Sequence, residues 1–326
     1  MSFRYGLPYK GSKNHIAKWI IDNLPKADTF IDLFFGGGAV THVALLSGKY
    51  KNFICNDIDG RLVELFKDCC YGKYTIENHP EWISREQFHK EKLNDAYIAL
   101  VWSFANNGID YIYGEKIEDF KHTYHLAVFQ DKPELLKPYG YEIHSSHLLK
   151  PYDRYLEFNK QIKQIARSDL DSIVRQIEIE RLQSLQSLQS LQSLQSLQSL
   201  QSLQSLQSDY VEAIAKVKPN LNNYIIYCDP PYQNTNCGKY KGFDNERFYE
   251  WAKEQDNIFI SEYSMPEDFI PYAWIEKTIL SAANGNDKKA KEIIYTNKKT
   301  YEKFNKHQRE LVSLNFSEQM TIFDYL

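Results

Sequence analysis

The sequence predicts an α/β protein built on a largely parallel sheet. Four short apolar runs end abruptly in polar or glycine-rich turns, and segments with helical spacing of apolar residues lie between them. The runs are Thr29–Gly38, Asn52–Asp57, Tyr224–Tyr232 and Asn257–Tyr263. Because ligands of open α/β sheets bind at the carboxyl ends of the strands, we expect the four endings to face one crevice.

The composition is typical of a globular protein. The chain has 326 residues, of which 43% are hydrophobic, and this suits one large domain or two lobes. No run approaches the roughly 18 apolar residues of a membrane helix, and the N-terminal residues lack a secretion signal, so a cytoplasmic protein without a membrane partner is expected. The cysteines form neither a paired framework nor two CxxC knuckles, so we expect reduced thiols and no metal. They are Cys55, Cys69, Cys70, Cys228 and Cys237.

The first run places Gly36, Gly37 and Gly38 at a strand-to-helix turn, where missing β-carbons let the backbone approach a ligand closely. Tight turning alone would also explain three glycines. Asp57 ends the next run, where a carboxylate can accept hydrogen bonds from both hydroxyls of a ribose. A nucleotide-like cofactor is therefore expected, whereas Thr41 breaks the GxGxxG spacing and disfavours a nicotinamide enzyme.

The tetrapeptide Asp229-Pro230-Pro231-Tyr232 is the most specific signal in the chain. A given tetrapeptide of this composition arises by chance in such a chain roughly once in a thousand. Its two prolines fix φ and remove amide donors, which leaves a stiff turn with a carboxylate beside an aromatic ring. Asp229 and the Pro230 carbonyl can accept both hydrogens of an amino group while Tyr232 stacks on the ring that carries it.

These motifs together resemble the DNA adenine N6-methyltransferases of the Dam-like family, in the same order along the chain. PYKGSK (Pro8–Lys13) is similar to the family's N-terminal cofactor motif, DLFFGGGAV (Asp32–Val40) to its glycine motif, and YCDPPY (Tyr227–Tyr232) to its catalytic motif. The resemblance implies a Rossmann-like sheet with an inserted, mainly helical target-recognition domain. It also implies S-adenosyl-L-methionine as methyl donor and a flipped adenine of double-stranded DNA as acceptor.

The resemblance also assigns roles to single residues. Catalysis would fall to Asp229, Pro230, Pro231 and Tyr232. Asp209 and Tyr210 resemble an acid–aromatic pair that contacts the cofactor's adenine, with residues 203–208 as the strand that leads to it. The implied cofactor-binding residues are Tyr9, Lys13, Asp32, Phe34, Gly36, Gly38, Asp57, Asp209, Tyr210 and Asp229. The implied DNA contacts are Asn106, Asn107 and Lys121.

The order of the motifs predicts the domain organisation. We expect residues 1–73 and 203–312 to form the cofactor-binding and catalytic domain, and residues 74–171 to form the target-recognition domain. A helix and a tandem repeat would fill residues 172–208, and residues 313–326 would form a C-terminal tail. In that tail, Gln319–Phe323 resembles the peptides by which DNA enzymes dock on the bacterial sliding clamp, although a tail that packs on its own domain explains the same residues.

The repeat consists of nine copies of Leu-Gln-Ser at residues 182–208. On an α-helix, leucines three residues apart fall back by about 60° per copy, and along a strand they point to opposite faces in turn. Neither structure is specified by the pattern alone. We expect a spacer or projecting helix from which most copies can be removed; the alternative is that the repeat sets the distance between two working parts.

Several functions remain open at this point. Methylation of cytosine at N4 needs a similar amino pocket, and a DNA-binding module with an inactive site would keep the same fold. Methylation of RNA or of protein glutamine is disfavoured because those enzymes usually carry Asn where this chain has Asp229. The net charge of −4 does not indicate a nucleic-acid partner, although residues 285–310 are locally basic. A restriction partner is left open.

Overall fold

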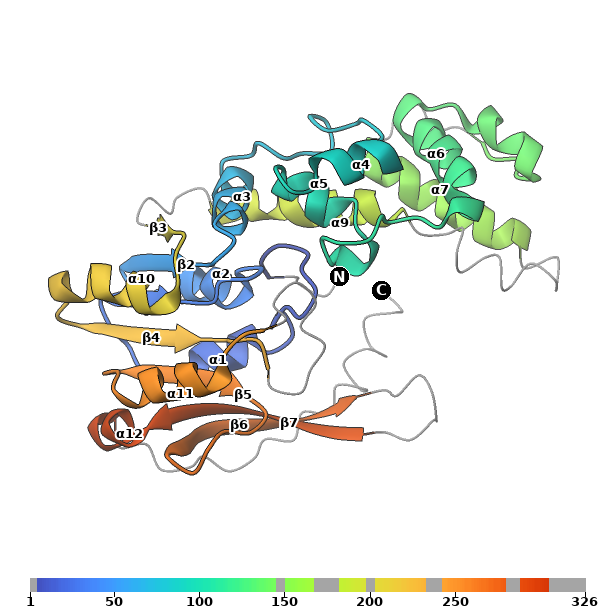
Figure 1. Ribbon diagram of the computed structural model, residues 1–326. Coiled ribbons are helices and arrows are strands. Elements are labelled where there is room, and N and C mark those ends of the chain that lie inside the picture. The colour runs from blue at the N-terminus through green and yellow to red at the C-terminus, as the bar shows by residue number, and fades with distance from the viewer. Residues whose placement is uncertain are drawn as a thin grey trace. The chain divides into compact units, whose positions relative to one another are not determined.

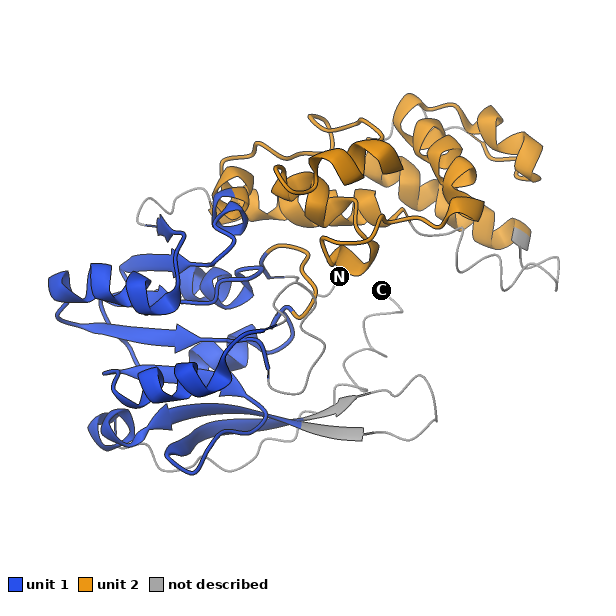
Figure 2. Cartoon of the chain, viewed as in Figure 1, with its two compact units in different colours: residues 1–6, 12–64, 199–326 blue, residues 7–11, 65–198 orange. Residues whose placement is uncertain are grey.

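The chain divides into two compact units, which Figure 2 distinguishes by colour. Unit 1 comprises residues 1–6, 12–64 and 199–326, and unit 2 comprises residues 7–11 and 65–198. The computed structural model describes residues 5–144, 150–166, 182–197, 203–232, 242–279 and 288–304. Unit 2 therefore continues beyond residue 171, where the sequence placed a boundary, and it includes most copies of the repeat.

Unit 1 contains a seven-stranded sheet in the order β3-β2-β1-β4-β5-β7-β6 (Figure 1). Strands β1 to β5 pair in parallel with one another, and β7 is antiparallel to both β5 and β6. The strands are β1 (Thr29–Asp32), β2 (Asn52–Asn56), β3 (Leu203–Leu206), β4 (Tyr224–Cys228), β5 (Ile258–Glu262), β6 (Phe269–Ile279) and β7 (Lys288–Asn297). The predicted α/β class, its largely parallel sheet and the four predicted strand runs are confirmed.

Helices cover both faces of this sheet because its central strands are apolar on both sides. Every residue of β1, β4 and β5 is buried, as expected for parallel strands enclosed by helices. The helices are α1 (Ala17–Asn23), α2 (Ala39–Leu46), α10 (Tyr210–Val217), η5 (Lys218–Asn220), α11 (Asn245–Lys253) and α12 (Lys298–Phe304). Helix α3 (Arg61–Cys70) begins in unit 1 and continues into unit 2.

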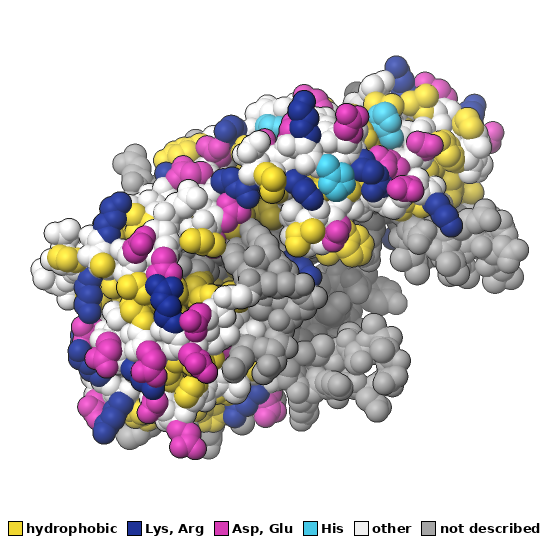
Figure 3. Space-filling model, viewed as in Figure 1, with side chains coloured by type: hydrophobic (Ala, Val, Ile, Leu, Met, Phe, Trp, Pro, Cys, Tyr) yellow, Lys and Arg dark blue, Asp and Glu magenta, His cyan; other side chains and the backbone are white. Residues whose placement is uncertain are grey.

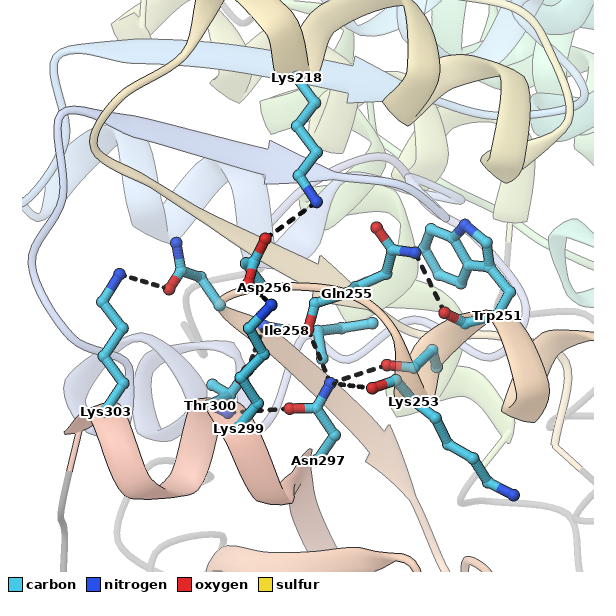
Figure 4. Close-up of polar contacts among 12 residues, drawn as sticks. Lys218, Trp251, Lys253, Gln255, Asp256, Ile258, Asn297, Lys299, Thr300 and Lys303 are labelled. Carbon is cyan, nitrogen blue, oxygen red and sulfur yellow. Dashed lines mark hydrogen bonds and ion pairs between the residues drawn. The ribbon is translucent and has the colours of Figure 1, made fainter.

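The end of β7 is fixed by the side chain of Asn297, which is 2% exposed (Figure 4). Its amide nitrogen donates to the carbonyls of Ala252 and Gln255 at 2.9 and 2.7 Å, and its oxygen accepts from the Thr300 backbone N–H at 2.9 Å. One side chain thus joins the ends of α11 and β7 to the start of α12. Nearby, Lys299 forms an ion pair with Asp256, so part of the basic stretch serves structure.

The regular secondary structure described in unit 2 is helical, apart from one isolated bridge between Ser103 and Tyr111, and irregular segments connect the helices. Its core is rich in aromatic rings: Trp82 stacks on Tyr113 at 5.3 Å and meets Trp102 edge-on at 5.1 Å. The helices are α4 (Arg85–Glu91), α5 (Ala96–Val101), η1 (Phe104–Asn106), α6 (Glu115–Gln130), η2 (Pro133–Tyr139), α7 (Pro151–Ala166), α9 (Gln183–Gln192) and η4 (Ser193–Leu197). None of the described helices is long and apolar enough to span a membrane.

The repeat forms part of the core of unit 2. The leucines of its first six copies are each at most 3% exposed; they are Leu182, Leu185, Leu188, Leu191, Leu194 and Leu197. The polar residues of single copies make distinct contacts: the Ser187 hydroxyl accepts from the Asn106 amide at 2.9 Å, and the Gln183 amide donates to the Ser103 carbonyl at 3.0 Å. The structure therefore differs from a spacer, because identical copies occupy different, packed environments.

A change of helix type explains how a three-residue period is buried. In α9 the side chains of Leu185, Leu188 and Leu191 span about 120° around the helix axis, so on a short helix they still form one apolar stripe. The chain then tightens into the 3₁₀-helix η4, where three residues complete a turn and Leu194 and Leu197 fall in line. The drift that a long α-helix would accumulate is thereby avoided.

The last copies of the repeat adopt a third conformation. Residues Leu203–Leu206 form β3, paired in parallel with β2, as predicted for the strand that leads to Asp209. Leu206 is 8% exposed and lies in the core with Ile54 and Ile214. The same tripeptide is thus helical in unit 2 and extended in unit 1.

Two Ser-to-Ala substitutions in identical local sequence test whether the copies are interchangeable. Ser187→Ala removes a buried hydrogen bond and leaves the Asn106 amide with one partner fewer, so we expect a loss of about 1–3 kcal/mol in the free energy of unfolding. Ser196→Ala alters an exposed hydroxyl and should stay within about 0.5 kcal/mol of the parent. Urea unfolding measures both, and equal stabilities would contradict the docked repeat.

Candidate active site

Five acidic residues lie at or directly after the carboxyl ends of the parallel strands of unit 1. They are Asp32 in β1, Asp57 after β2, Asp209 after β3, Asp229 after β4 and Glu262 in β5. The carboxyl ends of parallel strands share one edge of the sheet, so these side chains gather there, as the sequence predicted for its strand endings. This edge is the candidate active site.

The glycine turn after β1 is shaped by positive φ angles that disfavour other residues. Gly36 and Gly38 have φ of 51° and 67°, and a β-carbon on Gly38 would lie 2.2 Å from the Phe35 ring. The Gly36 N–H donates to Asp57 Oδ2 at 2.8 Å, which joins this turn to the end of β2. Asp57 Oδ1 accepts from the Asp59 N–H at 2.9 Å. A carboxylate of fixed orientation therefore lies beside a turn without β-carbons, an arrangement that fits a ribose and its flanking groups.

Asn56, which the sequence analysis did not single out, connects three strand ends. Its amide nitrogen donates to the Leu33 carbonyl at 3.1 Å and to the Ser208 carbonyl at 3.0 Å. Its oxygen accepts from the Ser208 N–H at 3.2 Å. The last residue of the repeat is thereby fixed next to β2, directly before Asp209. Its position beside Asp57 at the end of a predicted strand was the available signal.

Asp32 is 2% exposed, and its Oδ2 accepts a hydrogen bond from the Thr41 hydroxyl at 2.7 Å. Burial raises the pKa of Asp32 to about 7, and the negative charges of Asp229 and Asp57 act in the same direction. Thr41 thus has a structural role that explains its presence where a dinucleotide motif would have glycine. This hydrogen bond joins the end of β1 to the first turn of α2, on either side of the glycine turn.

Asp209 and Tyr210 begin α10 at the same edge. Asp209 caps the helix by accepting from the Val211 N–H at 3.0 Å and forms a two-pronged ion pair with Arg247, with both N–O distances at 3.0 Å. Tyr210 is 5% exposed and packs 5.6 Å from the half-buried Phe34 ring. Arg247 was not predicted, because its place in the sequence gives no sign of this partner. Of the predicted pair, Tyr210 therefore packs in an aromatic cluster that includes Phe34, and Asp209 is held by Arg247.

The catalytic turn places Asp229 and Tyr232 around one cation. Lys13 Nζ lies 2.7 Å from Asp229 Oδ1 and 4.4 Å from the centre of the Tyr232 ring. Burial raises the pKa of Asp229, whereas the Lys13 ammonium beside it lowers that pKa. The resemblance assigned Lys13 to the cofactor, and the structure brings it to Asp229, the carboxylate that the resemblance assigned to catalysis. A nitrogen that carries hydrogens is thus held between a carboxylate and an aromatic face.

The remaining predicted residues belong to unit 2. Tyr9 lies in its segment of residues 7–11. Asn106 is engaged by the Leu100 carbonyl and Ser187, and Asn107 accepts from the backbone N–H groups of Ile109 and Asp110, so both side chains stabilise their own loop. The expectation of a surface DNA contact from Lys121 needs correction, because Lys121 is 1% exposed and its Nζ lies 5.7 Å from the centre of the Tyr113 ring.

The same loop of unit 2 has features that the sequence did not reveal. Ala105 and Asn106 have φ of 50° and 55°, unusual for residues other than glycine, and this backbone leaves the Phe104 ring 60% exposed. Backbone strain of this kind motivates a functional hypothesis for the loop, whereas a single exposed aromatic side chain is common on protein surfaces. The surface of the described residues in Figure 3 otherwise shows Lys and Arg interspersed with Asp and Glu.

Two predictions from the sequence concern a sliding clamp and a metal ion. Gln319–Phe323 lies outside the described residues, so docking on a sliding clamp stays a prediction. Among the described residues, no group of three or more His, Cys, Asp and Glu side chains is arranged to hold a metal ion.

The sheet, the glycine turn after β1 and the DPPY turn after β4 together define a Rossmann-like methyltransferase unit. The model of the D12 class N6 adenine-specific DNA methyltransferase family matches residues 9–307, and the chain belongs to this family. The protein is accordingly an enzyme that methylates adenine in DNA at N6. Of the functions left open by the sequence, the family match supports this one over N4-cytosine methylation and over an inactive module.

No curated protein matches the chain. Among solved structures, the rRNA methyltransferase aviRa from Streptomyces viridochromogenes is similar with 11% identity and a TM-score of 0.34, over 89% of this chain and 85% of that chain.

The raised pKa of Asp32 predicts a pH dependence of stability. Asp32 releases its proton near pH 3.8 when unfolded and near pH 7 when folded, so the folded state binds the extra proton between these values. The free energy of unfolding should therefore fall as pH rises through this window. In Asp32→Asn this contribution is absent, and the variant should gain on the order of a few kcal/mol relative to the parent between pH 4.5 and 7.5.

Urea unfolding of both proteins at several pH values measures the effect. Asp153→Asn, at an exposed position of α7, is the control and should keep the parent's pH dependence. A stability difference between Asp32→Asn and the parent that stays constant with pH would contradict the assignment.

Proposed function

We propose that this enzyme transfers a methyl group from S-adenosyl-L-methionine to N6 of an adenine flipped out of double-stranded DNA at specific sites. The observation that supports this most directly is the contact of one ammonium group with both Asp229 and Tyr232, at 2.7 and 4.4 Å. The turn after β4 thus holds a nitrogen that carries hydrogens beside an aromatic face. The exocyclic amino group of adenine likewise carries hydrogens on a nitrogen, and the planar ring that bears it can stack on an aromatic face.

The cofactor site is proposed at the ends of β1 and β2. The glycine turn offers backbone at close range, and Asp57, held by Gly36, offers carboxylate oxygens to ribose hydroxyls. Phe34, half-buried and packed against Tyr210, supplies an apolar surface next to the turn. S-adenosyl-L-methionine supplies an electrophilic methyl group on a sulfonium sulfur.

The proposed chemistry requires that Asp229 be ionised. Its burial disfavours the charge, and the ammonium of Lys13 offsets that cost. Asp229 and the Pro230 carbonyl then accept the two hydrogens of the adenine amino group, while Tyr232 stacks on the base. Both acceptors stabilise the positive charge that develops on N6 as it gains the methyl group, and they are held in place before the reaction. The nitrogen returns to neutrality by passing one proton to the Asp229 carboxylate, from which water removes it.

Access to the amino group requires that the base leave the helix, because enzymes cannot reach it within the stack. We assign DNA contact in unit 2 to the loop that carries Phe104, Asn106 and Asn107. An exposed aromatic ring can stack on or wedge between bases, and the amide side chains hold its loop in shape. Lys121 is not part of this proposal because it lies in the interior.

Replacement of Asp229 tests the proposal. Asp229→Asn keeps the shape of the side chain but removes its charge and one acceptor, so we expect methyl transfer to fall by about 100-fold or more while DNA binding changes little. Unmethylated DNA is incubated with labelled S-adenosyl-L-methionine, digested to nucleosides and analysed for N6-methyladenine. Sequencing of the modified DNA then gives the recognition site.

Asp22→Asn, which alters an exposed carboxylate paired with Lys18, is the matched control and should retain full activity. Label in N4-methylcytosine would overturn the choice of base. Full residual turnover of Asp229→Asn would overturn the role of the carboxylate.

A further inference from the structure

Glu292 is a buried acidic residue in the middle of β7. It is 6% exposed, and in the antiparallel pairing of β6 and β7 it lies opposite Ile275. Its Oε2 accepts a hydrogen bond from the Tyr232 hydroxyl at 3.2 Å. This contact joins a strand near the edge of the sheet to the last residue of the catalytic turn.

The Tyr232 ring is restrained on three sides. Glu292 holds its hydroxyl, the Lys13 ammonium lies over its face, and the Tyr263 ring meets it edge-on at 4.7 Å with an interplanar angle of 82°. The two prolines before Tyr232 fix the backbone but leave rotation about the side-chain bonds free. These contacts therefore set the plane of the ring. The directional ones are the hydrogen bonds of its hydroxyl, whose partners are Glu292 and the Asp229 carboxylate.

A buried carboxylate at this place is costly. Transfer of a charge from water to the interior is unfavourable unless hydrogen bonds or opposite charges compensate, and Asp229 places a second negative charge nearby. The two acids disfavour each other's charge, which contributes to the raised pKa of Asp229. The same negative charges and burial raise the pKa of Tyr232, so its hydroxyl remains a donor to Glu292.

We propose that Glu292 is a positioning residue that fixes the plane of the Tyr232 ring for stacking on the target adenine. The inference rests on the proposed function of Tyr232 and adds a residue from β7 to the site. Glu292 does not contact the reacting atoms; it acts through the hydroxyl of Tyr232. A freely rotating ring would lose orientation of the base, and an orientation error slows transfer even when the base is bound.

Three variants examine the two ends of the hydrogen bond. Tyr232→Phe removes the donor and keeps the ring, Glu292→Ala removes the acceptor, and Glu292→Gln keeps an acceptor of similar size. We expect kcat to fall by about tenfold or more in the first two and by less than about threefold in Glu292→Gln, since tenfold corresponds to about 1.4 kcal/mol. The double variant Tyr232→Phe/Glu292→Ala should be no slower than the slower single variant, because each substitution removes the same bond.

Two readouts separate positioning from a structural role. The KM for S-adenosyl-L-methionine should stay unchanged, and a duplex with 2-aminopurine at the target position should show altered fluorescence of the flipped base in Tyr232→Phe and Glu292→Ala. Tyr249→Phe, which removes a buried hydroxyl outside the site, and Glu276→Ala, which removes an acid of neighbouring β6, are the matched controls and should behave like the parent.

The outcomes distinguish this inference from the proposed function. If the parent enzyme forms no N6-methyladenine, the proposed function fails. If the parent methylates adenine and Tyr232→Phe keeps full kcat and parent-like fluorescence, the positioning role of Glu292 is wrong. Additive losses in the double variant would also overturn it, because they would show that the two groups act independently.

Discussion

The hydrogen bonds of Asn56 hold together the edge of the sheet on which the site is built. This amide side chain, at the end of β2, is hydrogen-bonded to Leu33, which follows β1, and to Ser208, which lies shortly after β3. Each of these positions is followed directly by a part of the candidate site: the glycine turn, Asp57 and Asp209. An amide can donate and accept at once, so one buried side chain satisfies backbone groups of two neighbouring strand ends. The relative positions of the cofactor-site residues depend on this bridge.

The chemistry at this edge follows from several acidic side chains that are buried close together. Burial raises the pKa of Asp32 and of Asp229; the charges of Asp229 and Asp57 add to the shift at Asp32, and Glu292 adds to it at Asp229, where the ammonium of Lys13 opposes it. The two carboxyls therefore differ in character: Asp32 pairs with a hydroxyl inside the sheet, whereas Asp229 has a cation beside it. Glu292 extends the same acidic environment to Tyr232 from β7.

The motifs with strong local constraints could be predicted from the sequence. Gly36 and Gly38 need positive φ, and Asp229 is followed by two prolines, so both turns are specified by neighbouring residues. Arg247 and Glu292 could not be predicted in the same way, because their partners Asp209 and Tyr232 lie 38 and 60 residues away. Such contacts depend on strand order and register. Lys121 is the reverse case: the resemblance implied a contact with DNA, whereas its side chain is buried in α6.

The sequence by itself determined the parallel strand runs, the glycine turn and the DPPY turn, because hydrophobic runs and backbone-restricted residues act locally. The conformation of the repeat was decided by the tertiary structure. The same Leu-Gln-Ser unit is an α-helix in α9, a 3₁₀-helix in η4 and a strand in β3, so its local preference cannot have chosen among them. Burial of its leucines in unit 2 favours the helical forms. Pairing with β2 and the hydrogen bonds of Asn56 favour the extended form. A period of three residues fits neither an α-helix nor a strand well, so the tertiary contacts of each copy decide its conformation.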